Sequence, residues 1–172
     1  ESDEEGGVFE ASGGGVIEEL RLGRTGFNKS TGTGLTLTAA DGVVRNVSLE
    51  TVLARNNTGG VTSTATGRYQ SETLSFVSTG FNESGDAGLV ILANNDSLVS
   101  DMSLETVDVR NNTNGLVVVA ENDSIVSGLT TDTVGLKSDA DAAVIRAGSS
   151  PAANATVENL SFASTGFNQS GR

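Results

Sequence analysis

The sequence predicts an all-β, single-domain chain that winds into a parallel solenoid of about six coils. The main observation is a pair of apolar residues, separated by one residue, that recurs with steps of 27, 27, 28, 27 and 31 residues. Repeats of this length, without the 3.6-residue periodicity of helices, are typical of stacked strand coils. The six pairs are Leu20/Leu22, Val47/Leu49, Leu74/Phe76, Met102/Leu104, Leu129/Thr131 and Leu160/Phe162.

Two further strand-like segments recur in phase with these pairs. A second column lies three residues before each pair and consists of Ile17, Val44, Ser71, Val99, Val126 and Val157. A third segment follows later in each repeat, at 35–37, 61–63, 89–92, 116–119 and 143–145. Polar turn residues separate these segments. We therefore expect three parallel strand ladders, with one rung of each ladder in every coil.

The composition suits a thin core. Hydrophobic residues make up 36% of the 172 residues and aromatic residues only 4%, while Gly (22) greatly outnumbers Pro (1). Frequent Thr and Val favour strands, and glycine supplies turns. We expect an acidic N-terminal segment at 1–15 that contains one strand at 8–11, followed by the solenoid at 16–172, whose last coil is incomplete.

The apolar columns resemble those of right-handed parallel β-helix proteins of pectate-lyase-like architecture. The resemblance covers nearly the whole chain and implies a fold, not an activity. A right-handed winding follows from that family and from the crossover rule for parallel strands. The chain also resembles archaeal secreted β-solenoid proteins that form surface filaments.

The net charge of −12 excludes a nucleic-acid partner, because too few basic residues are present to neutralise phosphates. Only two of the basic residues are Lys, which fits adaptation to strong salt as well as an ordinary solubility device. No apolar run is long enough to span a membrane. Because the sequence begins at Glu1, we expect a processed, secreted protein; an edited sequence is the alternative.

Enzymatic activity is not expected, since the chain contains neither His nor Cys. The best catalytic candidate is Asp139 and Asp141 beside Lys137, an arrangement that is more often a solvated loop. We expect no cofactor apart from N-linked glycans. Structural calcium between Asp and Asn turns is an alternative, although the glycine-rich nonapeptide that binds calcium in β-rolls is absent.

Ten of the 14 Asn residues lie in Asn-x-Ser/Thr sequons, which favours N-glycosylation of a secreted chain. Five of them fall in the same turn of successive coils. The alternative is a structural ladder of stacked, inward-pointing Asn side chains. Asn46 and Asn159 lie at expected strand starts and are predicted to be the least accessible. The predicted glycosylation sites are Asn28, Asn56, Asn82, Asn95, Asn111, Asn122, Asn154 and Asn168.

The two ends of the repeat are complementary. Residues 8–11 match the third strand of a coil, because Phe9 precedes Leu20 by the same step that separates Ile91 from Met102. The final repeat lacks this third strand. We expect head-to-tail association of identical copies by strand complementation. The alternative is that 1–15 form a disordered tail. The predicted interface residues are Val8, Phe9, Glu10, Ala11, Val157, Leu160, Phe162 and Phe167.

The sequence thus predicts a structural subunit of a secreted, N-glycosylated extracellular filament or sheath. A polysaccharide-binding or polysaccharide-cleaving β-helix is one alternative, although Trp is absent and Tyr69 is the single Tyr. A cytosolic bactofilin-like polymer is another, and the density of sequons argues against it.

Overall fold

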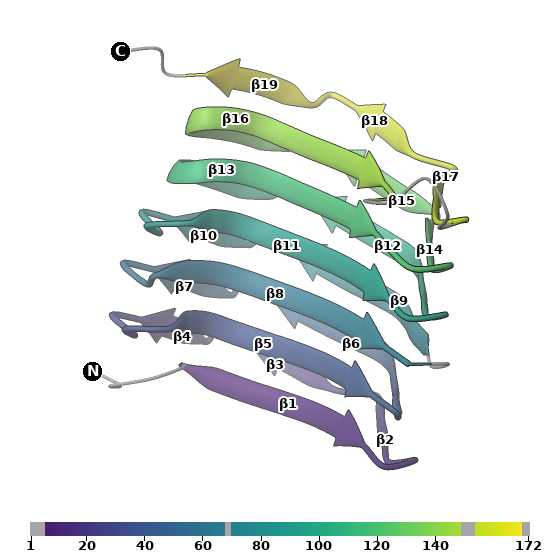
Figure 1. Cartoon of the computed structure of the whole chain (residues 1–172). Helices are drawn as coiled ribbons and strands as arrows, with labels where there is room; N and C mark the ends of the chain where they lie inside the picture. Colours follow the sequence, from purple (N-terminus) through teal and green to yellow (C-terminus); the bar gives the residue numbers. More distant parts are fainter. Residues whose placement is uncertain (1–5, 68–69, 149–153, 170–172) are drawn as a thin grey trace.

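The computed structural model describes residues 6–67, 70–148 and 154–169. These residues form strands and turns without any helix, and the strands stack along one axis from the N-terminal coil to the C-terminal coil (Figure 1). All strand pairs are parallel, so the chain is a β-solenoid of about six coils, consistent with the expected right-handed winding.

The described strands belong to two sheets. Sheet I has nine strands: β2 (Val16–Glu18), β3 (Arg21–Gly23), β6 (Val43–Glu50), β9 (Gln70–Val77), β12 (Leu98–Glu105), β14 (Ile125–Ser127), β15 (Leu129–Asp132), β17 (Thr156–Glu158) and β18 (Ser161–Ala163). Sheet II has ten strands: β1 (Gly7–Ser12), β4 (Gly26–Asn28), β5 (Thr33–Ala40), β7 (Leu53–Arg55), β8 (Gly59–Thr66), β10 (Gly80–Asn82), β11 (Ala87–Asn94), β13 (Asp108–Ala120), β16 (Gly135–Ala147) and β19 (Gly166–Gln169).

The predicted register of the apolar pairs is confirmed. Leu49 and Phe76 are fully buried at the centre of the column, whereas Leu22 and Phe162 at its ends are only partly buried. Each coil therefore buries the apolar residues of its neighbours. The aligned column is Leu22, Leu49, Phe76, Leu104, Thr131 and Phe162.

The predicted third strand is also confirmed, including the strand at 8–11. Strand β1 pairs with β5 of its own chain, and Phe9 lies beside Leu37. The inward column continues from these two residues through Ser63, Ile91 and Val118 to Ile145.

The expected division into three ladders is wrong in one respect. The first two predicted columns share sheet I, where β6, β9 and β12 each contribute to both. The segment Gly26–Asn28 and its equivalents, for which no strand was predicted, form a further ladder of short strands that joins sheet II through β13 and β16.

The corners of the coil explain this difference. Glu19, Arg24 and Lys29, spaced by five residues, all have positive φ, between 51° and 61°. A residue in this conformation interrupts the alternation of a strand, so that side chains three residues apart, such as Ile17 and Leu20, can both face the core. The same spacing recurs at Asn46, Thr51 and Asn56 and in the later coils. Sequence reasoning missed these corners because most of them are not glycine.

Replacing Leu104 with Ala should lower the free energy of unfolding by about 2–5 kcal/mol, because it opens a cavity in the central column. Leu104 is only 2% exposed. Chemical denaturation followed by circular dichroism measures this loss.

The matched control is Ser103→Ala, one residue earlier on the outer side of β12, which should change stability by no more than about 0.5 kcal/mol. Equal stability of the two variants would contradict the assigned register.

Candidate assembly surfaces and asparagine sites

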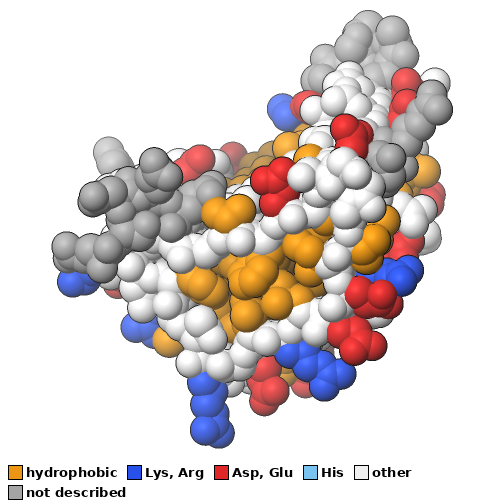
Figure 2. All heavy atoms as spheres, turned by 90° about the horizontal axis from the view of Figure 1, so that it is seen from below, with side chains coloured by type: hydrophobic (Ala, Val, Ile, Leu, Met, Phe, Trp, Pro, Cys, Tyr) orange, Lys and Arg blue, Asp and Glu red, His pale blue; other side chains and the backbone are white. Residues whose placement is uncertain are grey.

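The N-terminal end of the solenoid exposes its core. Figure 2 views the molecule from this end and shows an apolar centre surrounded by polar and charged side chains. Phe9, Ile17, Leu20, Leu22 and Phe27 pack against the buried core but remain partly exposed, because in the described residues no further rung lies below them. Of the predicted interface residues in β1, Phe9 and Ala11 lie in inward columns, whereas Val8 and Glu10 face outward.

The C-terminal end is open in the same way. Phe167 is 50% exposed although its register partner Leu136 is buried, and Ile145 is 42% exposed although its partner Val118 is buried. The other predicted interface residues at this end, Val157, Leu160 and Phe162, are partly buried against the core. Burial in these columns is therefore lost where the described rungs stop, whatever the residue type.

The two end faces of the solenoid are also complementary in their strands. Strand β19 pairs with Gly135–Ser138 of β16, and in the described residues no strand covers the outer edge of 141–147 of β16. At the opposite end, β1 extends the same ladder by one strand below β5. One end therefore carries the strand that is missing at the other.

All ten sequon asparagines are accessible. Asn82 is half-buried and the others are exposed. Asn46 and Asn159, expected to be the least accessible, are exposed because they occupy left-handed corners and do not begin strands. The expected stripe divides into two adjacent columns. Asn28, Asn82 and Asn168 align with Arg and Lys residues, whereas Asn56 and Asn111 lie one residue further along the chain.

The recurring Thr-Gly-Phe-Asn motif has a structural explanation. The Oδ1 atom of Asn28 accepts a hydrogen bond from the backbone N–H of Arg55 at 3.1 Å, and Asn82 accepts one from Arg110 at 2.8 Å. A Cβ atom at Gly26 would lie 2.8 Å from Nδ2 of Asn28, so glycine leaves room for the folded-back carboxamide. Phe of the motif fills the core column, as buried Phe81 shows.

An inward-facing asparagine ladder exists, but it uses Asn57 and Asn112, the residues that follow the sequon asparagines Asn56 and Asn111. The Oδ1 atom of Asn57 accepts a hydrogen bond from the backbone N–H of Ser30 at 2.9 Å, and its Nδ2 atom donates one to the carbonyl of Phe27 at 2.9 Å. Asn112 makes the same bonds with Ser84 and Phe81, both at 2.8 Å. Buried Ser and Asn therefore alternate from coil to coil at positions 30, 57, 84 and 112.

The sequons thus have a second explanation. Asn is favoured at left-handed corners, where Asn56, Asn95, Asn111 and Asn122 lie. The sequon hydroxyl residues Ser30, Ser84, Ser97 and Ser124 are buried. Ser97 donates to the carbonyl of Ala65 at 2.8 Å and Ser124 accepts from the backbone N–H of Ser97 at 3.1 Å, whereas the hydroxyl groups of Ser30 and Ser84 have no hydrogen-bond partner among the described residues. Ser170, the hydroxyl residue of the Asn168 sequon, lies outside the described residues. The excess of sequons is therefore partly a consequence of the fold.

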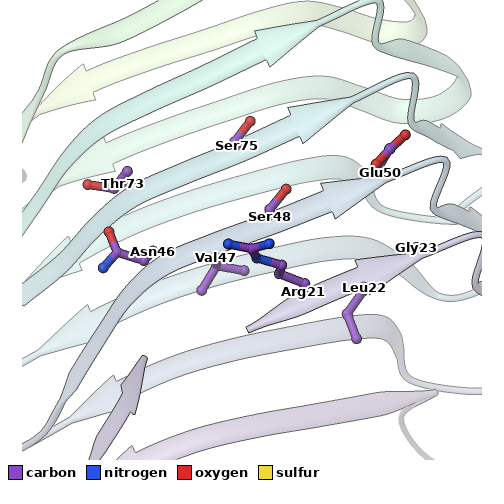
Figure 3. A pocket seen from close by; sticks show the side chains of 9 residues that line it. All are labelled: Arg21, Leu22, Gly23, Asn46, Val47, Ser48, Glu50, Thr73 and Ser75. Atoms are coloured by element: carbon purple, nitrogen blue, oxygen red, sulfur yellow. The ribbon is translucent and has the colours of Figure 1, made fainter. Parts of the chain in front are cut away.

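A shallow hollow of about 390 Å³ lies on the outer face of sheet I, over β3, β6 and β9 (Figure 3). Arg21 and Glu50 line it together with the side chains of Asn46, Ser48, Thr73 and Ser75. No aromatic side chain lies among its lining residues, so it lacks the stacking platform that sugar rings need.

At one position of sheet I the charges alternate between neighbouring coils, whereas Glu105 and Asp132 lie one rung apart as like charges. The Nη2 atom of Arg45 lies 2.9 Å from Oε2 of Glu18, and Glu72 occupies the equivalent position in the next coil. The hydrogen bond with Glu18 and the charge of that carboxylate raise the pKa of Arg45 above its ordinary value, with a smaller contribution from Glu72. Oppositely charged neighbours one rung apart reduce the repulsion within an acidic solenoid.

The carboxylates considered for catalysis, Asp139 and Asp141, lie exposed in β16 near Lys137. Across the described ranges, no three acidic side chains come close enough to share a metal ion.

The described residues also contain no apolar helix of membrane-spanning length. No protein-family model and no curated protein sequence matches the chain.

Replacing Asn112 with Ala should destabilise the protein by about 1–3 kcal/mol or more, because it leaves a buried N–H and a buried carbonyl without their partners. Thermal unfolding checks this. The neighbouring Asn111→Gly retains the left-handed corner and should change stability by no more than about 0.5 kcal/mol. An Asn111→Gly loss as large as that of Asn112→Ala would show that the inner ladder has no special role.

Proposed function

We propose that the chain is a structural subunit of a filament that grows head to tail along the solenoid axis. This proposal rests on the complementary end faces, because β1 extends one end by a strand that the opposite end lacks. Strand β1 of one copy docks on 141–147 of the next copy, which brings Phe9 one rung from Ile145. The coil that begins with β17, β18 and β19 is thereby closed by a strand of the neighbouring copy.

The structure supports a mechanism that differs from donation of a free arm. Strand β1 is hydrogen-bonded to β5 of its own chain and offers its second edge to the neighbour. Edge docking of this kind gains backbone hydrogen bonds without the entropy cost of ordering a disordered strand. Six coils of about 4.8 Å give an axial repeat of about 29 Å per subunit.

Charges at the junction follow from the same register. Arg146 of one copy lies one rung from Glu10 of the next, which is attractive. Glu158 lies one rung from Glu18, which is repulsive and opposes growth. Within one chain Arg146 contacts Glu121 at 3.1 Å and is exposed, so it remains accessible to a second carboxylate.

Secretion and N-glycosylation belong to the same proposal. The exposed sequon asparagines are the support for it, and glycans there would surround the sides of the filament. At the ends of the solenoid, where copies meet, Phe27 and Phe167 lie in inward columns, whereas the sequon asparagines next to them, Asn28 and Asn168, lie in an outward column.

Reversing either junction charge should weaken polymerisation, and combining the two variants should restore it. Arg146→Glu and Glu10→Arg alone each replace an attraction with a repulsion, which should raise the critical concentration about three- to tenfold. In a mixture, every junction between the two different variants regains opposite charges, so the two proteins should copolymerise in alternation. Sedimentation of each protein and of the mixture measures this.

Glu121→Gln is the control for the intrachain pair of Arg146 and should polymerise like the unmodified protein. An unchanged critical concentration in both charge-reversal variants would contradict the proposed junction. A mixture that sediments like its separate components would contradict it as well.

Glycopeptide mass spectrometry of the native protein should find glycans at the eight predicted sequons, with the lowest occupancy at Asn28, Asn82 and Asn122. The carboxamides of Asn28 and Asn82 bond the next coil, and Nδ2 of Asn122 donates to Asn94 at 2.7 Å. If all eight are unmodified, the sequons are explained by the fold alone.

A further inference from the structure

The outer face of one ladder of sheet II is almost free of charge. It is formed by β1, β5, β8, β11 and the segments 116–120 of β13 and 143–147 of β16, and its inward residues Leu37, Ile91 and Val118 are buried. Two ranks of side chains face outward. The first rank is Val8, Thr36, Thr62, Val90, Val117 and Val144, and the second is Glu10, Thr38, Thr64, Leu92, Val119 and Arg146.

This face differs from the rest of a strongly acidic molecule. The chain has a net charge of −12, yet in these ranks only Glu10 and Arg146 are charged. The outer face of sheet I, by contrast, carries several charged residues: Glu18, Arg21, Arg45, Glu50, Glu72, Glu105, Asp132 and Glu158.

An apolar patch occupies the C-terminal half of the face. Val90, Leu92, Val117 and Val144 are half-buried by one another, and Val119 is only 6% exposed. Parallel sheets are normally covered on both faces, and a sheet with apolar side chains on its outer surface indicates a surface that is covered in use. None of the ten sequon asparagines lies in the two ranks, so this face would stay bare on a glycosylated filament.

We propose that this face, called here the lateral face, joins two filaments of this chain side by side. This inference rests on the proposed head-to-tail filament. In that filament Arg146 lies one rung from Glu10 of the next copy, so both charges of the lateral face are compensated. The outer face of sheet I carries an excess of acidic residues, which favours separation of the copies on that side, whereas the lateral face brings no such repulsion.

The area of the lateral face explains why pairing requires the filament. A face about 29 Å high and about 17 Å wide offers roughly 500 Å² per subunit, below the roughly 800 Å² per partner of a typical stable interface. Single subunits therefore stay apart. A filament repeats the face along its length, and the weak contacts add up once the first has formed.

Val117→Lys tests the proposal, because it places a charge at the centre of the lateral face without entering the core. The unmodified protein should form paired or bundled filaments that sediment at low speed. Val117→Lys should form single filaments of unchanged axial repeat, with at least about a fivefold loss of low-speed pellet. Negative-stain microscopy confirms the number of filaments side by side.

Thr130→Lys is the matched control, since it adds the same charge to the outer face of sheet I and should bundle normally. Val117→Thr introduces the residue found at positions 36 and 62 of the same rank. It should reduce the low-speed pellet less than Val117→Lys does. Bundling by Val117→Lys at the level of the unmodified protein, or an equal loss with Thr130→Lys, would overturn the lateral face. Single filaments of the unmodified protein would overturn it too, while leaving head-to-tail growth intact. Absence of any filament would refute the proposed function and the lateral face together.

Discussion

The structure depends on one constraint: each coil obtains its backbone hydrogen bonds and most of its core contacts from the coils above and below it. The inward columns show this directly, because Leu49 and Phe76 are fully buried while Leu22 and Phe162, in the same column, are not. A thin solenoid has no second layer that could cover a terminal rung. Its ends are therefore the surfaces with most to gain from a neighbour, and identical coils make another copy a fitting one.

The corners set the shape of the coil and restrict its sequence. Left-handed residues such as Glu19, Arg24 and Lys29 turn the chain every five residues while keeping the inward columns in phase. Inside the corner, Asn57 and Asn112 satisfy backbone groups of the preceding coil. Much of the Asn and Ser content of the chain follows from these two local requirements, including part of the sequon pattern that indicates glycosylation.

The sequence predicted the solenoid and its register well, because stacked columns repeat apolar residues at a fixed period. The strand containing Phe9 was found from that period alone, and its pairing with Leu37 confirms it. The corners were missed because Glu, Arg, Lys and Thr occupy positions where glycine would have been the recognisable signal. An inward asparagine ladder was the alternative for the sequon asparagines, and the structure forms it with Asn57 and Asn112 instead, because sequence alone does not reveal which residue of the pairs at 56–57 and 111–112 points inward.

The lateral face was not apparent in the sequence for a related reason. Thr36, Val90 and Val117 are ordinary strand residues in the sequence, and only the register places them in one rank. The charges behave in the same way, since Glu10 and Arg146 lie at opposite ends of the chain and acquire a common role only when copies are stacked.

Helical reconstruction of purified filaments by electron cryomicroscopy shows directly whether copies stack end to end along the solenoid axis. We expect an unbroken solenoid with an axial repeat of about 29 Å per subunit, in which β1 of one copy lies beside 141–147 of the next. Copies joined through any other surface, or a gap between successive solenoids that leaves Phe167 and Phe9 exposed, would contradict it.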